Sequence, residues 1–400
     1  MATVATGDGA MAGAAASFWA TLRVTMPWLP SEPVTEEAFC IARKSLPVRF
    51  LRRLFQLVLL RFAHEMANRY RWKGFRLLGI DGMDFQLPHS DLLTGMYPAV
   101  SNQYGPRVHP QARLLGLVGL WDGLCHDFRL VPIKYSEQRC ARIVIKALKA
   151  GDLLLADRNF PDYHTMAAVI SQGAEFLFHL PSNRFHKLSR QSTPSGRSDE
   201  WNVVLQLPKK LRQKCPHLQA TIKARILKYQ LPGFRTSWLI TSLEDTEKYP
   251  YKDVVALYHE RWRQETAHRE WKYTLGMDNL RSKTPQGILK EVLVQMTLNN
   301  VIRWIMAEAA GIERRPVDLQ FLASKRLILA AVPAMTAAQP ATLPCIYREL
   351  LASIAQLLIL VRPGRKYPRP FDDLPRNKGH GKFVIPAKLP STKEANHVFI

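Results

Sequence analysis

The sequence is poor in cysteine, in long apolar runs and in acidic residues. Its five cysteines lie far apart and never form a C-x-x-C pair, which excludes a disulfide framework and a structural zinc site. The longest apolar stretches, 327–332 and 352–361, fall well short of the ~18 residues that span a bilayer. We therefore expect a protein of a reducing compartment, without a membrane-spanning segment.

Two further signals are missing. No G-x-x-x-x-G-K loop is present, so nothing indicates a nucleotide cofactor. No lysine or arginine precedes the apolar start of the chain, and Asp8 stands where a secretory signal is basic. These absences favour a cytoplasmic protein that works without ATP.

Positive charge is what the sequence has in excess. Among 400 residues, 56 Lys and Arg stand against 33 Asp and Glu, which gives a formal net charge of +23. A charge of that size indicates a polyanionic partner. DNA, RNA and an anionic membrane surface all remain open on charge alone. Because 47% of the residues are hydrophobic, the chain can bury a large core, and wholesale disorder is excluded.

The order of the predicted elements is typical of an α/β domain that follows a basic helical start. Apolar spacing of three and four residues predicts helices, and short apolar runs that end at turn residues predict strands. The expected segments are helices at 33–71, 137–149 and 161–172, and strands at 77–80, 112–120, 128–135, 153–156 and 175–180.

The composition changes between about 183 and 245. We expect a Ser- and Arg-rich loop at 184–199, followed by three strands. Twelve basic and two acidic residues lie between 183 and 243, a large share of the net charge. This β insertion is therefore expected to contact a nucleic-acid backbone.

The last third of the chain is predicted to be mainly helical. Long helices are expected at 253–275 and 285–310, because Gly276 and Gly311 follow them and Pro285 is a favoured first-turn residue. One or two further helices are expected before Val361. A tail at 362–382, rich in Pro, Gly, Lys and Arg, is expected to be poorly ordered.

Two aspartates follow predicted strands, Asp81 after 77–80 and Asp157 after 153–156. Ligands of α/β sheets gather at the carboxyl ends of strands, so both are candidates for a site. Asp81 before Gly82 is also a common kind of turn residue, and Asp157 is suited to a turn or helix cap. Both interpretations stay open at this level.

The helix expected at 253–275 has an unusual stripe. At 100° per residue, Tyr258, Arg261, Glu265 and Lys272 fall within about 60° of one another. An aromatic ring, two cations and a carboxylate suit a groove that holds a metal and a phosphate chain. The alternative is a solvated face on which Arg261 and Glu265 form an ordinary i,i+4 pair.

The spacing Tyr258-x2-Arg261-x3-Glu265-x6-Lys272 resembles the Tyr-Arg-Glu-Lys signature of bacterial insertion-sequence transposases with an Asp-Asp-Glu triad. Other motifs similar to that family follow in the expected order over about 77–310. They are Ile80-Asp81-Gly82, Tyr135-Ser136-Glu137, the run from Gly151 to Arg158, and Thr284-Pro285 with Glu291, Asn300 and Arg303.

Two positions depart from the family's pattern. Asp84 lies three residues after Asp81, where a hydroxyl residue is more usual, and makes the first acidic position ambiguous. His179 lies where an arginine is expected.

The resemblance implies an α/β fold, an RNase H-like catalytic core interrupted by the β insertion, with helical N-terminal and C-terminal regions. It implies Asp81, Asp157 and Glu265 as catalytic residues and ligands of two Mg²⁺ ions, with Mn²⁺ as a substitute. Two divalent ions about 4 Å apart activate an attacking oxygen and stabilise the leaving one, and carboxylates suit Mg²⁺.

The same resemblance assigns the other residues of the stripe to DNA. Arg261 and Lys272 would bind phosphates beside the scissile bond. Tyr258 would stack on an unpaired base or donate to a phosphate, and both remain open. Trp201, Trp238, Trp262 and Trp271 are candidates for base stacking or, alternatively, for the core.

We therefore expect a DNA transposase that cuts and joins double-stranded DNA at the terminal inverted repeats of its own element, as a homodimer in a synaptic complex. The expected domains are a basic helical region for end recognition at 1–73, the catalytic core at 74–310 and a helical region with a basic tail at 311–400. A catalytically inactive, transposase-derived DNA-binding protein is the alternative. A basic nucleic-acid-binding module with structural carboxylates is a third possibility.

Overall fold

The computed structural model describes residues 13–360 with short gaps at 14–15, 17–18, 21, 25, 33, 67–68, 100, 103–104, 107–108, 196 and 232–234. The tail predicted at 362–382 lies outside the described residues. The chain divides into two units, 1–359 and 360–400, and nearly all described residues belong to the first.

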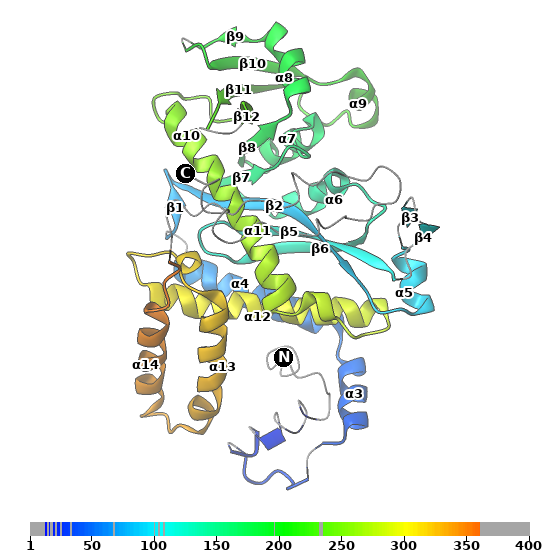
Figure 1. Ribbon diagram of the computed structural model, residues 1–400, viewed down its shortest axis with the longest axis vertical. Coiled ribbons are helices and arrows are strands. Elements are labelled where there is room, and N and C mark those ends of the chain that lie inside the picture. Colours follow the sequence, from blue (N-terminus) through cyan, green and yellow to red (C-terminus); the bar gives the residue numbers. More distant parts are fainter. Residues whose placement is uncertain are drawn as a thin grey trace, which may run out of the picture. The chain divides into compact units, whose positions relative to one another are not determined.

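A mixed ten-stranded sheet forms the centre of the described part of the chain (Figure 1). Nine of its strands run in the order β6-β5-β2-β7-β8-β12-β11-β10-β9, and β1 pairs separately with β2. The strands are β1 (Arg71–Trp72), β2 (Phe75–Gln86), β5 (Gln111–Gly119), β6 (Cys125–Pro132), β7 (Asp152–Ala156), β8 (Glu175–Leu180), β9 (Thr193–Pro194), β10 (Glu200–Gln206), β11 (Thr221–Tyr229) and β12 (Ser237–Thr241). A separate small ladder consists of β3 (Ser101–Asn102) and β4 (Gly105–Pro106).

Strand direction changes twice across the sheet. The pairs β6-β5 and β5-β2 are antiparallel, and β2-β7 and β7-β8 are parallel. From β8 onward, the neighbours β12, β11, β10 and β9 are again antiparallel. The basic segment after β8 therefore extends the same sheet.

Helices cover both faces of the sheet (Figure 1). Figure 1 shows α4 and α12 side by side along one edge, with α13 and α14 as a hairpin beyond them. The helices are α3 (Glu36–Ser45), α4 (Val48–Met66), α5 (Asp91–Met96), α6 (Glu137–Val144), α7 (Tyr163–Ile170), α8 (Ser182–Leu188), α9 (Lys209–Lys214), α10 (Tyr251–Tyr258), α11 (Trp262–Arg269), α12 (Pro285–Ala310), α13 (Phe321–Ala337) and α14 (Leu343–Ala355).

The central strand β7 explains why both faces need cover. Side chains alternate between the two faces of a strand. Leu154 and Ala156 belong to the core under α6 and α7, whereas Leu153 and Leu155 belong to the core under α10. All five residues of β7 are buried, as expected for a parallel strand between two helical layers.

Three sequence predictions about elements were wrong. The strand expected at 77–80 does not end at Asp81, because β2 continues to Gln86 through antiparallel pairing with β5. The loop expected at 184–199 contains α8, whose Phe185 packs between Trp201 and Trp238. The helix expected at 253–275 is segmented, with a 3-10 turn at His259–Arg261 and a π-helical turn at Glu270–Thr274.

One prediction about the last third of the chain was confirmed closely. The helix at 285–310 has the predicted bounds, because Thr284 caps its first turn and Gly311 follows its last residue. The five cysteines are free thiols. Among the described residues, no helix combines the length and the apolar character needed to cross a bilayer.

Candidate active site

Asp81 and Asp157 lie side by side on neighbouring parallel strands. The last paired residues of β2 and β7 are Ile80 and Ala156, and each aspartate is the next residue along its strand. β7 ends there, whereas β2 continues, so Asp81 lies within a strand and Asp157 begins a turn. The structure therefore brings these two predicted acids together.

Backbone amides orient both carboxylates. The N–H of Gly82 donates to Asp81 Oδ1 at 2.8 Å, and the N–H of Asn159 donates to Asp157 Oδ1 at 2.8 Å. The second contact closes a short turn of the kind that aspartate side chains form. In both aspartates the backbone amide binds Oδ1, and Oδ2 takes no part in these two hydrogen bonds.

Asp81 occupies an unfavourable place for a negative charge. Burial raises the pKa of Asp81 to about 7, and the neighbouring carboxylates of Asp157 and Glu137 add to the increase. The Gly82 amide and the Arg261 guanidinium act in the opposite direction. A site that concentrates carboxylates in this way favours a bound cation.

The helix that carries Glu265 packs directly on the sheet next to Asp81. A Cβ at Gly79 would lie 2.6 Å from Gln264 Oε1, and a Cβ at Gly116 would lie 2.8 Å from the Trp271 ring. Only glycine allows so close an approach of α11 and the π turn to β2 and β5. In Figure 1 these helical segments cross the sheet diagonally.

His268 lies on the same helix, with Nδ1 4.0 Å from Asp81 Oδ2. Burial lowers the pKa of His268 to about 4, so its imidazole is neutral at neutral pH. His268 therefore lies between α11 and β2 but carries no positive charge to neutralise the Asp81 carboxylate.

Glu265 is held by Arg261. The guanidinium Nη2 donates to Glu265 Oε1 at 3.0 Å, one turn away on the helix. The same guanidinium is close enough to Asp81 to lower the pKa of that carboxyl. Arg261 therefore supplies positive charge to two of the three predicted acids.

The three acids do not form a ready coordination shell. Within the described residues, no three His, Cys, Asp or Glu side chains lie close enough together to hold a metal ion. Asp81 and Asp157 adjoin each other, but Glu265 is engaged by Arg261. The carboxylate donors fit a hard divalent cation in type, and Arg261 contacts one of the two Glu265 oxygens, Oε1.

Tyr258 and Lys272 differ in their surroundings. Tyr258 is only 7% exposed, and its hydroxyl donates to the Ala156 carbonyl at 3.4 Å, just before Asp157. Burial raises the pKa of this phenol. Lys272 lies in the π turn, with Nζ 5.7 Å from the centre of the exposed Tyr273 ring. The regular stripe expected from ideal helix geometry is therefore altered by the 3-10 and π turns.

The four tryptophans considered for base stacking differ clearly in solvent exposure. Trp271 is fully buried and donates to Asn299 Oδ1 at 3.0 Å, and Trp201 and Trp238 pack on Phe185. Trp262, next to Arg261, is 54% exposed. Of the four, Trp262 is the one whose ring is mainly open to solvent.

Helix α12 holds the π turn from its other side. Arg303 pairs with Glu270, and Asn300 exchanges two hydrogen bonds with the backbone of Cys125 at 2.8 and 2.9 Å. These buried polar groups connect α12 to the turn that carries Lys272 and to the start of β6. The sequence placed Asn300 and Arg303 within a motif but did not indicate this anchoring role.

Several groups around the acids carried no assigned role in the sequence. Asp84 forms a two-pronged ion pair with Arg113 at 2.6 and 2.8 Å, and Arg113 Nη1 also lies 3.5 Å from Glu137 Oε1. Asn159 donates to Glu137 Oε2 at 3.3 Å. The motif Tyr135-Ser136-Glu137 was the available signal for Glu137; Arg113 had none, because its contacts depend on strand pairing.

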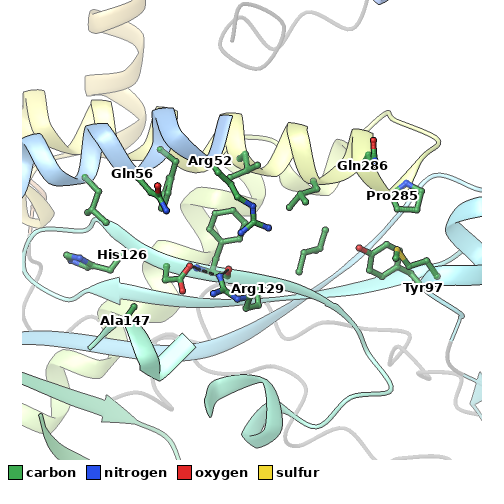
Figure 2. A pocket seen from close by; sticks show the side chains of 16 residues that line it. Arg52, Gln56, Tyr97, His126, Arg129, Ala147, Pro285 and Gln286 are labelled. Carbon is green, nitrogen blue, oxygen red and sulfur yellow. Dashed lines mark hydrogen bonds and ion pairs between the residues drawn. The ribbon is translucent and has the colours of Figure 1, made fainter. Parts of the chain in front are cut away.

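A cavity of about 450 Å³ lies elsewhere, between α4, β6 and α12 (Figure 2). Figure 2 shows Arg52 and Gln56 on one side, Arg129 on the sheet and Gln286 near the start of α12. None of the six predicted site residues lines it. The three predicted acids, each half-buried, therefore lie outside this cavity.

Comparison with known proteins places this arrangement in a family. The sequence profile described as "Transposase DDE domain" matches residues 72–300. The Escherichia coli (strain K12) protein "Transposase InsG for insertion sequence element IS4" is 26% identical over 347 residues, which cover 86% of this chain and 77% of that protein.

A solved structure, the cryo-EM structure of a piggyBac transposase synaptic complex with hairpin DNA, is also similar. Its TM-score is 0.41 with 9% sequence identity, and the match covers 73% of this chain and 59% of that chain. The family profile spans more than half of the present chain and contains all three predicted acids. This chain belongs to the transposases with a DDE domain and is a DNA transposase.

Proposed function

We propose that this transposase cleaves and joins phosphodiester bonds at the terminal inverted repeats of its own insertion sequence, with Asp81, Asp157 and Glu265 as the catalytic acids. The observation that carries the proposal is the pairing of Ile80 with Ala156, which sets Asp81 beside Asp157 under the helix of Glu265. The three acids come from three different segments of the chain: β2, the turn after β7, and α11.

An RNase H-like core is part of the proposal. Its support is the sheet order β6-β5-β2-β7-β8, with the first three strands antiparallel and the last three parallel. The β insertion, at about 183–245, follows β8 and precedes the helix of Glu265. We retain the division into 1–73, 74–310 and 311–400 as recognition region, catalytic core and C-terminal region.

The proposed cofactor is a pair of Mg²⁺ ions, with Mn²⁺ as a substitute, held by Asp81, Asp157 and Glu265. Bound divalent ions would activate the attacking oxygen and stabilise the leaving one. The support is the carboxylate donor set and the raised pKa of Asp81. No nucleotide cofactor is proposed.

Arg261 and Lys272 are proposed to bind DNA phosphates beside the scissile bond. Arg261 has a planar fork suited to phosphate, and in the protein alone that fork contacts Glu265. Lys272 supplies a point charge from the adjacent π turn. Tyr258, buried against Ala156, is proposed to support the Asp157 turn; its predicted DNA contact would require the ring to move.

The proposed partners are double-stranded DNA, at the element ends and at the target, and a second copy of the chain in a synaptic complex. The positive charge of the segment after β8 supports the DNA contact. Two of its twelve basic residues, Arg197 and Arg225, pair with Asp199 and Glu200, and the other ten are exposed. We propose a cytoplasmic location in a bacterium, at the nucleoid when DNA is bound.

The test is cleavage of DNA that carries the two ends flanking the gene, with Mg²⁺ or with EDTA. We expect cuts only with Mg²⁺, and their loss by at least a hundredfold in Asp157→Asn and in Glu265→Gln, because each change removes one charged oxygen donor. DNA affinity in EDTA should be unchanged or slightly higher in both variants.

Asp278→Asn serves as the control, because Asp278 is an exposed acid outside the set. It should cut like the unmodified protein. Tight DNA binding without cutting under any divalent ion would instead favour the alternative, an inactive transposase-derived DNA-binding protein.

A further inference from the structure

Glu137 is an acidic side chain that reaches the catalytic site from a third direction. It is the first residue of α6, directly after the cap residue Ser136. A Cβ at Gly82 would lie 2.5 Å from Glu137 Oε1. The carboxylate therefore packs against the backbone of the residue that follows Asp81.

Asn159 connects Glu137 to the second catalytic acid. Its side-chain Nδ2 donates to Glu137 Oε2 at 3.3 Å, and its backbone N–H donates to Asp157 Oδ1 at 2.8 Å. Asn159 thus contacts both Glu137 and Asp157, and the Glu137 carboxylate lies against Gly82, the residue after Asp81.

The charge of Glu137 is only partly compensated. Its side chain is only 16% exposed, and its cationic neighbour Arg113 lies 3.5 Å away. Arg113 directs its close contacts, at 2.6 and 2.8 Å, to Asp84 instead. A carboxylate that is largely shielded from water and faces two further carboxylates is unfavourable unless a cation joins them.

We propose that Glu137 is a fourth acidic residue of the catalytic site, and that its charge strengthens the binding of the divalent cation by Asp81 and Asp157. The inference rests on the proposed function, because it adds a residue to that cation site. Arg113 and Asn159 keep the Glu137 carboxylate in place, and Gly82 leaves the space that it occupies.

The experiment is a titration of the full-length protein with Mn²⁺ alone, with free Mn²⁺ measured by electron paramagnetic resonance. Glu137→Gln should raise the Kd for Mn²⁺ about tenfold, whereas Glu137→Asp, which keeps the charge, should stay within about threefold of the unmodified protein. Glu313→Gln, a change at an exposed acid, is the matched control and should leave the Kd unchanged.

Asp157→Asn in the same titration distinguishes a failure of the Glu137 role from a failure of the cation site itself. If Asp157→Asn weakens Mn²⁺ binding and Glu137→Gln does not, the role of Glu137 is overturned and the proposed function stands. If Asp157→Asn also leaves Mn²⁺ binding unchanged, the cation site itself is wrong. If Glu137→Gln lowers the content of folded protein, Glu137→Asp decides: a tenfold loss of affinity there contradicts a role of charge.

Discussion

At the scale of single residues, Asp81, one of the three proposed catalytic acids, lies where its negative charge costs stability. Asp81 is largely buried beside Asp157 and Glu137, and its pKa rises to about 7. An acid whose pKa is raised by folding contributes stability that is complete below its unfolded pKa, near 4, and lost as the pH rises through about 7. Without a cation, the folded protein is therefore penalised by Asp81 at alkaline pH.

We predict that Asp81→Asn raises the melting temperature in EDTA at pH 8 by a few degrees, because the amide carries no charge to bury. The gain should shrink as the pH is lowered from 8 toward 5, where Asp81 of the unmodified protein is protonated. Thermal unfolding across this pH range measures the effect, with Asp278→Asn as an exposed control. A gain that grows on acidification would contradict the prediction.

The segment expected as one regular helix at 253–275 contains irregular turns that residue spacing does not predict. Tyr258, Arg261, Glu265 and Lys272 form a stripe on an ideal helix, but the real segment contains a 3-10 turn and a π turn. In this segment Tyr258 is buried and its hydroxyl donates to the Ala156 carbonyl, and Arg261 donates to the Glu265 carboxylate. Such irregular turns are often found at functional sites, and spacing alone does not reveal them.

At the scale of elements, the distance between the helix of Glu265 and the sheet depends on two glycines. Gly116 on β5 faces the ring of Trp271, and Gly79 on β2 faces Gln264. A side chain at either position would move α11 away from Asp81. The position of Glu265 relative to the other acids thus depends on the close packing of the Gln264 and Trp271 side chains against the two glycines.

We predict that Gly116→Ala destabilises the protein by about 1–3 kcal/mol, because the buried Trp271 ring has no free space to move into. Cleavage should fall together with stability. Gly95→Ala is the matched control, since Gly95 lies exposed in α5 with no atom within 4 Å of a Cβ. It should be neutral or slightly stabilising, and thermal unfolding of both variants tests the difference. Equal melting temperatures would show that α11 can shift without cost.

At the scale of the whole molecule, the positively charged segment after β8 is part of the central sheet. The strands after β8 belong to the same sheet as β2 and β7, so the basic segment and the proposed catalytic aspartates, Asp81 and Asp157, share one sheet. Short helix α9 concentrates exposed cations at Lys209, Lys210, Arg212 and Lys214. Under the proposed function, a DNA contact on this segment would align the duplex with the acids.

We predict that replacing Lys209 and Lys210 together by serine weakens DNA binding and lowers the salt dependence of log Kd by up to about 2, near 0.9 for each lost phosphate contact. The control removes two exposed cations from α13 and α14, Arg326 and Arg348. Binding isotherms at several salt concentrations measure both slopes. Equal losses in the two double variants would place no special DNA contact on α9.

The sequence by itself determined the features that depend on neighbouring residues along the chain. Helix α12 begins after its Thr284 cap and ends before Gly311, as its local signals predicted. The buried strand β7 follows from its run of apolar residues. The motif spacing also identified the family before any contact was known.

Only the tertiary structure decided the features that depend on residues far apart in the chain. β2 runs on past Asp81 because β5 pairs with it, and α8 forms where a loop was expected because Phe185 packs on Trp201 and Trp238. Glu137 meets Asp81 because α6 begins beside Gly82. The physical reason is common to all three: pairing and burial between distant segments outweigh the weaker local preferences that a sequence pattern records.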